Sequence, residues 1–309
     1  MSYPYLSDIL NTWFGTNWHI PIAMFGTFVA TALVVASYVA RLEFSRYEKL
    51  GLLPQSIASS QGSIAPHQLV SDLVIVCAIW GLIGARLFHI LDYPKRFMAD
   101  PLGMILSNAG FTIYGGLVFG TCAGLIYLKK RSIPIAVSLD AVAPAMILGY
   151  GVGRLGCQIA GDGDWGIASN MSLKPSWLPE WFWAQTYENN IIGMTIQEPG
   201  VYPTPIYEFG MAMIIFSVLW SLRKRIRKPG GLFAIYLILS GFERLLIEKI
   251  RINKELHIFD FSFTQAEMIS FFVILAGLVT AIMSSNSKPV GRVAFSLVVV
   301  GALTACANI

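Results

Sequence analysis

Long apolar runs recur along the chain, and each is about as long as a helix that crosses a bilayer. A hydrocarbon core of about 30 Å takes roughly 20 apolar residues in a helix. Seven such runs predict transmembrane helices at 20–40, 69–91, 111–128, 133–155, 205–222, 231–250 and 265–283. Within the C-terminal segment 284–309, residues 293–309 are apolar enough for an eighth. The pattern therefore predicts an all-α, polytopic transmembrane bundle of seven or eight helices.

Composition indicates a chain that is solvated mostly by lipid. Of the 309 residues, 55% are apolar and 13% are charged, and the mean hydropathy is +0.62. Soluble domains are far less apolar, so we expect one integral membrane domain over residues 1–309, in contact with membrane lipids. The net charge of +4 is typical of basic cytoplasmic loops and does not indicate a nucleic-acid partner. The cysteines and histidines lack the paired spacings of metal sites, so no metal is predicted.

The lysines and arginines between the runs predict the orientation, because basic loops stay on the cytoplasmic side. Thirteen of the twenty-two lie after the first, third, fifth and seventh runs, whereas six lie in the connections on the opposite side. The N-terminus is therefore predicted to be outside. The longest outer connection, 156–204, contains four tryptophans. Because tryptophan favours headgroup depth, this connection is predicted to cap the outer face.

The remaining three arginines, Arg86, Arg154 and Arg244, fall inside apolar runs. An arginine at the centre of a spanning helix costs about 3 kcal/mol or more unless it is paired or hydrated. In the predicted orientation each lies near the outer end of its run, so all three converge on one leaflet. Guanidinium groups at that depth suit a phosphate group.

Two segments place carboxylates near these arginines. Arg244 and Glu248 lie four residues apart in G-F-E-R-L-L-I-E-K-I-R and so share a helical face. They form either an ion pair that stabilises the bundle or a phosphate-binding arginine oriented by its carboxylate. Arg154 lies in G-Y-G-V-G-R-L-G-C-Q-I-A-G-D-G-D-W-G, followed by Asp162 and Asp164. Tight helix packing explains the first glycines, but it does not explain these three charges at the outer interface.

Other polar residues of the runs have equally good structural explanations. Asp140, Tyr207 and Glu208 are as typical of helix–helix hydrogen bonds or caps as of a functional site. Tyr114, which precedes two glycines, is a weaker candidate still because tyrosine is common at membrane interfaces.

Taken in order, these segments resemble the bacterial prolipoprotein diacylglyceryl transferase family from about residue 18 to residue 283. The resemblance rests on six segments: G-A-R-L-F-H-I-L-D-Y-P around Arg86, Y-G-G-L from Tyr114, S-L-D-A-V-A-P around Asp140, G-R-L-G-C at Arg154, P-T-P-I-Y-E before Glu208 and E-R-L-L-I-E-K-I-R at Arg244. It implies seven transmembrane helices in the bacterial cytoplasmic (inner) membrane, an outside N-terminus and an active site that faces the outer leaflet.

The resemblance also implies the reaction. The diacylglyceryl group of phosphatidylglycerol passes to the lipobox cysteine of a preprolipoprotein signal peptide, which forms a thioether and releases glycerol phosphate, without a cofactor. Arg154 and Arg244 would then bind the phosphate, with Glu248 orienting Arg244 and Arg86 as a helper. Asp162, Asp164 or Tyr114 would take the thiol proton, and the sequence does not choose among them.

The chain departs from the family pattern at several positions. Tyr114 and Tyr202 stand where the family usually has histidine, Cys157 stands where it has asparagine, and the signature acid is either Asp162 or Asp164. These departures allow a second hypothesis, a non-catalytic or altered-substrate paralogue that binds lipid or signal peptide. A third, an anion transporter, predicts polar residues through the whole bundle, whereas the inner halves of the runs are nearly all apolar.

Overall fold

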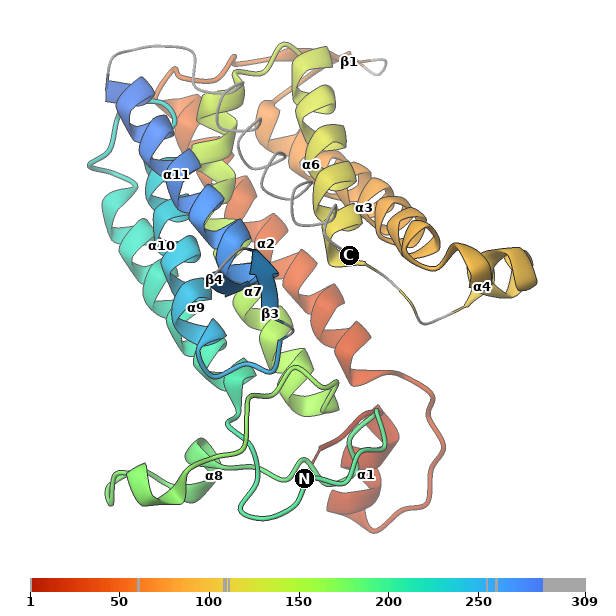
Figure 1. Ribbon diagram of the computed structural model, residues 1–309. Coiled ribbons are helices and arrows are strands. Elements are labelled where there is room, and N and C mark those ends of the chain that lie inside the picture. Colours follow the sequence, from red (N-terminus) through yellow and green to blue (C-terminus); the bar gives the residue numbers. More distant parts are fainter. Residues whose placement is uncertain are drawn as a thin grey trace. The chain divides into compact units, whose positions relative to one another are not determined.

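The computed structural model describes residues 2–59, 62–107, 110, 112–253, 255–258 and 261–285, which are mostly helical (Figure 1). The long helices among them, of 18 residues or more, are α2 (Met24–Lys49), α3 (Val70–Asp92), α6 (Ile113–Lys130), α7 (Ile135–Ala160), α9 (Thr204–Leu222), α10 (Gly231–Glu248) and α11 (Gln265–Ser285). The short helices are α1 (Leu6–Phe14), η1 (Pro66–Leu69), α4 (Pro94–Ala99), α5 (Pro101–Leu106), η2 (Met171–Leu173) and α8 (Glu180–Trp183). Two antiparallel hairpins pair β1 (Ile57–Ser59) with β2 (Gly62–Ile64) and β3 (Glu255–Ile258) with β4 (Phe261–Thr264). The predicted helical class is confirmed.

Five of the long helices in the described part of the chain are long and apolar enough to cross a membrane. They are α2, α3 with the preceding η1, α7, α9 and α11. Large apolar side chains on them are exposed, including Val34 at 69% and Ile282 at 62%. Such surfaces face lipid in a membrane protein, so the chain is an integral membrane protein. The runs predicted at 111–128 and 231–250 coincide with α6 and α10, whose crossing stays a prediction, and 293–309 lies outside the described residues.

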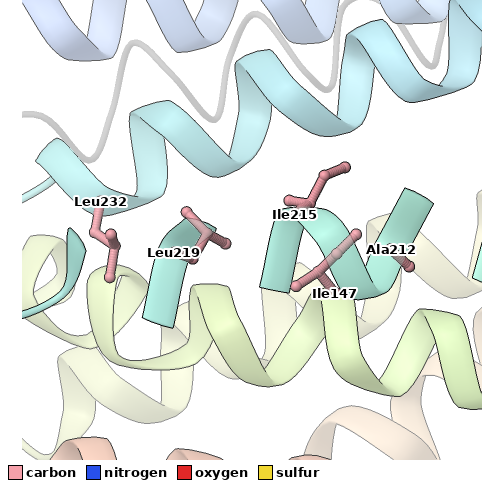
Figure 2. Close-up of a cluster of buried hydrophobic side chains, with 5 residues drawn as sticks. All are labelled: Ile147, Ala212, Ile215, Leu219 and Leu232. Atoms are coloured by element: carbon pink, nitrogen blue, oxygen red, sulfur yellow. The ribbon is translucent and has the colours of Figure 1, made fainter. Parts of the chain in front are cut away.

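The described residues form two compact units. One contains residues 2–36, 143–227 and 232–278, and the other contains residues 37–142, 228–231 and 279–285. In the first unit, α7, α9 and α10 pack through a core of buried aliphatic side chains (Figure 2), namely Ile147, Ala212, Ile215, Leu219 and Leu232. The prediction of a single membrane domain over the whole chain stays a prediction.

Glycines bring α3 and α6 together in the second unit. A Cβ atom on Gly115 would lie 2.2 Å from the main-chain oxygen of Gly84, and one on Gly84 would lie 2.4 Å from that of Gly115. The two helices therefore touch backbone to backbone, as small residues allow between membrane helices.

Asp140, in the same unit, has a structural role: it is buried in α7, and its Oδ2 accepts a hydrogen bond of 2.7 Å from the main-chain N–H of Gly230.

Main-chain contacts in the first unit hold three helix ends close together. Helix α7 stops at Gly161, whose φ of 62° is left-handed and suits glycine. Beyond it, the N–H of Gly166 donates to the oxygen of Tyr202 at 2.8 Å, just before α9, and that of Ile167 donates to the oxygen of Ile250 at 2.8 Å, just after α10. The end of α7, the start of α9 and the end of α10 are thereby joined, and the charged residues of the motifs lie at these ends.

Candidate active site

A fully buried carboxylate, Glu208 near the start of α9, stands at the centre of the charged residues and is 0% exposed. Its Oε1 accepts hydrogen bonds from Arg154 Nη2 at 2.9 Å and from Arg251 Nη1 at 3.4 Å. Arg244 Nη1 forms an ion pair with the same oxygen at 3.6 Å. Three guanidinium groups, from the end of α7, the end of α10 and the segment after α10, therefore meet around one oxygen atom.

Asp164 joins two of these arginines from the other direction. Its Oδ2 accepts a short hydrogen bond from Arg154 Nη1, and its Oδ1 accepts one from Arg251 Nη2 at 2.7 Å. Burial raises the pKa of this carboxyl group, but the two guanidinium charges outweigh burial and hold its pKa below the usual value. Asp164 is therefore an ionised bridge, and both of its oxygens are occupied.

Arg244 and Glu248 form the ion pair that their spacing predicts. Arg244 Nη2 lies 2.9 Å from Glu248 Oε2, one helical turn on. Asn253 Nδ2 donates to the other oxygen of Glu248 at 2.7 Å. The carboxylate is thus fixed by a second partner, and it directs the guanidinium of Arg244 toward Glu208.

A tyrosine completes the cluster from within α7. The hydroxyl of Tyr150 lies 3.2 Å from Glu208 Oε1 and 3.3 Å from Glu243 Oε1. The guanidinium of Arg154, one turn further along the helix, lies 5.3 Å from the centre of the Tyr150 ring, within cation–π distance. Tyr150 therefore supports Arg154 on one side and Glu208 on the other.

The cluster retains guanidinium nitrogens that form no hydrogen bond within the described part of the chain, although Arg244 Nη1 also lies 3.6 Å from Glu208 Oε1 in the ion pair described above. Arg154 Nε, Arg244 Nη1 and Arg251 Nε are buried and have no hydrogen-bond partner among the described residues. Buried N–H groups without acceptors are costly and rare. Guanidinium donors suit the oxygens of a phosphate, which they bind through charge-assisted hydrogen bonds. The arrangement can therefore bind a phosphate ester and stabilise negative charge on it.

The turn after α7 brings two carboxyl groups and a thiol together. Gly161 and Gly163 have φ angles of 62° and 97°, and the main-chain N–H of Asp164 donates to Asp162 Oδ1 at 3.3 Å. One side-chain atom each of Cys157, Asp162 and Asp164 lie within 4.8 Å of one another. Because both oxygens of Asp164 already accept from arginines, this group is poorly suited to a metal ion.

Comparison with known proteins shows the family of the chain. Residues 14–283 match the family model described as Prolipoprotein diacylglyceryl transferase. The chain belongs to this family.

Its relatives include several proteins named phosphatidylglycerol–prolipoprotein diacylglyceryl transferase. The one from Corynebacterium diphtheriae is 30% identical over 257 residues, which cover 78% of this chain and 83% of the relative. The one from Leptospira interrogans is 26% identical over 277 residues, 81% of this chain and 78% of the relative. The one from Staphylococcus saprophyticus is 26% identical over 267 residues, 85% and 86%. The similarity thus covers most of the chain.

In this member of the diacylglyceryl transferase family, five of the predicted site residues lie in one cluster: Arg154, Arg244, Glu248, Asp162 and Asp164. Sequence reasoning left Glu208, Arg251 and Tyr150 without a site role. Tyr150 and Arg251 had a local signal, because Tyr150 precedes Arg154 by four residues and Arg251 lies one further helical turn beyond Arg244 and Glu248. The partners of Glu208 and Arg251 come from distant segments, so spacing along the chain could not reveal them.

Two predicted site residues, Arg86 and Tyr114, belong to the other compact unit. Arg86 Nη1 donates to the main-chain oxygens of Met104 at 3.0 Å and Gly110 at 3.1 Å, and Nη2 donates to that of Ser107. These carbonyls lie at and beyond the end of α5, so Arg86 holds that end in place. Its role as a phosphate helper, and that of Tyr114 as proton acceptor, stay predictions.

Proposed function

We propose that this chain transfers the diacylglyceryl group of phosphatidylglycerol to the lipobox cysteine of preprolipoprotein signal peptides. The product is a thioether, and glycerol phosphate leaves. Family membership and the names of the relatives support the reaction. The cluster of guanidinium groups with unused donors supports the site. The family also implies a bacterial inner-membrane protein with seven spans. The arrangement of lysines and arginines along the chain supports an outside N-terminus, and with it an outer-leaflet site capped by residues 156–204.

The arginines carry out the phosphate chemistry in this proposal. As the bond between the glyceryl carbon and the phosphate oxygen breaks, negative charge grows on the departing glycerol phosphate. Arg154 and Arg244 receive this charge through N–H groups that form no hydrogen bond within the described protein, and Arg251 joins them because it shares both Glu208 and Asp164 with Arg154. Glu248 and Glu208 are positioning residues that fix the directions of the guanidinium planes.

The same positive charge assists the nucleophile. A cysteine thiol has a pKa of about 8.5, and neighbouring arginines lower it and favour the thiolate that attacks the glyceryl carbon. Arg86 is proposed only as a helper, since its guanidinium already donates to three main-chain carbonyls.

Replacement of Arg154 or Arg244 by alanine tests the proposal. Each variant should lose the transfer from phosphatidylglycerol vesicles to a synthetic lipobox peptide, measured by mass spectrometry as a gain of one diacylglyceryl unit. Lysine should restore little, because it keeps the charge but loses the planar fork. Arg225→Ala, which removes an exposed arginine after α9, is the matched control and should retain full transfer.

The outcome also separates the enzyme from its non-catalytic alternative. Full activity in the Arg154 and Arg244 variants, with folding verified by gel filtration, would overturn the site assignment. A wild-type protein that binds the peptide and phosphatidylglycerol but yields no mass gain would instead support the non-catalytic paralogue.

A further inference from the structure

The two aspartates of the turn after α7 differ in what holds them. Asp164 accepts a hydrogen bond from a guanidinium at each oxygen, from Arg154 and from Arg251. A carboxylate bound in this way is a weak base, because taking up a proton would break a charge-assisted hydrogen bond. Asp164 therefore has a positioning role and is unsuited to accept a proton.

Asp162 has the opposite surroundings. Its Oδ1 accepts a single main-chain hydrogen bond of 3.3 Å, from Asp164. Within the described segments, Asp162 forms no ion pair with a lysine, arginine or histidine at 4.0 Å or less. Burial raises the pKa of the Asp162 carboxyl group above its usual value, and the charge of Asp164 adds to this effect; a hydrogen bond with the Cys157 side chain and the charge of Arg154 oppose it without cancelling it. Of the two carboxylates, Asp162 is the better base near neutral pH.

The side chain of Cys157 shows how a sulfur atom is accommodated beside Asp162. Its Sγ lies 3.7 Å from Arg154 Nη1, and it belongs to the group within 4.8 Å that includes a carboxylate oxygen of Asp162. The turn thus brings together a sulfur, a carboxylate that is not ion-paired and a guanidinium. These are the groups needed to deprotonate a thiol and stabilise the resulting thiolate.

We propose that Asp162 is the catalytic residue that takes the proton from the lipobox thiol, an inference that rests on the proposed transferase function. The S–H proton moves to the Asp162 carboxylate, and the thiolate sulfur forms a bond with the glyceryl carbon of phosphatidylglycerol. The carbon–oxygen bond to the phosphate breaks, and its electron pair leaves with glycerol phosphate beside Arg154 and Arg244. Asp162 then returns its proton to water. Atoms and charge balance without a cofactor.

The charged and titratable groups around Asp162 define what a pH profile reports. They are Arg154 and Cys157 from α7, Asp164 from the same turn and Tyr187 from the connection to α9. Tyr187 does not compete as a base, because burial raises its pKa and its hydroxyl donates to Gln158 Oε1 at 2.7 Å. The acid limb of activity is therefore assigned to Asp162.

The test compares Asp162→Asn and Asp162→Glu with the wild type over a range of pH values. At pH 7, kcat/KM of Asp162→Asn for the lipobox peptide should fall about 100-fold or more, the usual contribution of a general base. The deficit should shrink as the pH approaches about 8.5, where the thiol ionises unaided. Asp162→Glu, which keeps a carboxylate, should still lose kcat/KM toward acid pH as the wild type does. Glu180→Gln removes an exposed carboxylate of the same connection and should match the wild type.

A selenocysteine peptide provides a readout that a structural role would not move. A selenol is ionised at neutral pH, so it needs no base and should restore most of the activity of Asp162→Asn. The proposal is overturned if Asp162→Asn keeps wild-type activity at pH 7, or if its loss is the same at every pH and with selenocysteine. A wild-type protein that transfers nothing would refute the transferase function itself, before any variant is compared.

Discussion

Glu208 is the residue whose replacement should damage the protein most. Its carboxylate is 0% exposed and neutralises part of the charge of Arg154, Arg244 and Arg251. In Glu208→Ala, three guanidinium groups share the two carboxylates to which they are still paired, Asp164 and Glu248, so one unit of buried positive charge is left uncompensated. Breaking a buried ion pair in this way costs about 3–5 kcal/mol. Glu208→Gln keeps the volume and one acceptor oxygen, so it should cost about 1–3 kcal/mol.

Unfolding in mixed micelles, followed by tryptophan fluorescence, measures these differences in the free energy of unfolding. Lys249→Ala is the matched control, because it removes an ion pair of 2.5 Å to Glu267 in which Lys249 is 72% exposed. It should unfold close to the wild type, as expected of an exposed pair. Adding inorganic phosphate should stabilise Glu208→Ala more than the wild type, since the anion compensates the surplus charge. A Glu208→Ala protein as stable as the wild type would show that the guanidinium groups do not depend on this carboxylate.

Three further outcomes follow from the structure. Gly115→Ala should lower the free energy of unfolding by about 1–3 kcal/mol, because the new methyl group meets the main-chain oxygen of Gly84. Gly210→Ala should leave it unchanged, because a Cβ atom at that position has no neighbouring atom within 4 Å among the described residues. Unfolding in micelles compares the two variants. The pKa of Asp164 is lower in the folded protein than in the unfolded chain, where it is about 4. The carboxylate therefore contributes fully to stability above about pH 4, and this contribution is lost as the pH falls through the pKa of the folded state. Melting curves between pH 2 and 6 should show this loss of stability in the wild type and not in Asp164→Asn. Arg86→Ala should speed amide hydrogen exchange in residues 101–107, because the carbonyls of Met104 and Ser107 lose their donor, as mass spectrometry can detect.

The helices could be predicted from hydropathy because a helix in the hydrocarbon core is stable only if its surface is apolar along the full length of the span. The run at 265–283 agrees closely with α11 (Gln265–Ser285). The run at 20–40 differs more, since α2 covers Met24–Lys49. Its last turns are polar but remain helical, and Arg46 there pairs with Glu43 at 2.7 Å. Hydropathy detects the part of a helix in lipid and not its continuation beyond.

The site could be predicted only where its residues are neighbours along the chain. Arg244 and Glu248 follow from a four-residue spacing, and Arg154 from the high cost of a charge in an apolar run. Glu208 could not be recognised, because its three arginine partners come from segments 36 to 54 residues away. A helical pattern fixes which residues share a face, but it does not fix which faces meet.

The pairing of each guanidinium group with internal carboxylates governs which anions the protein can recognise. The cell contains many small anions, and a site with a large positive field would draw them in by long-range attraction. Here the carboxylates mostly cancel that attraction, so chloride and free phosphate are only weakly attracted to the site from a distance. A lipid headgroup is held at the membrane by its acyl chains and needs only short-range hydrogen bonds to dock. In the proposed reaction the freed glycerol phosphate loses that anchor, so we expect it to diffuse away without competing with the next lipid.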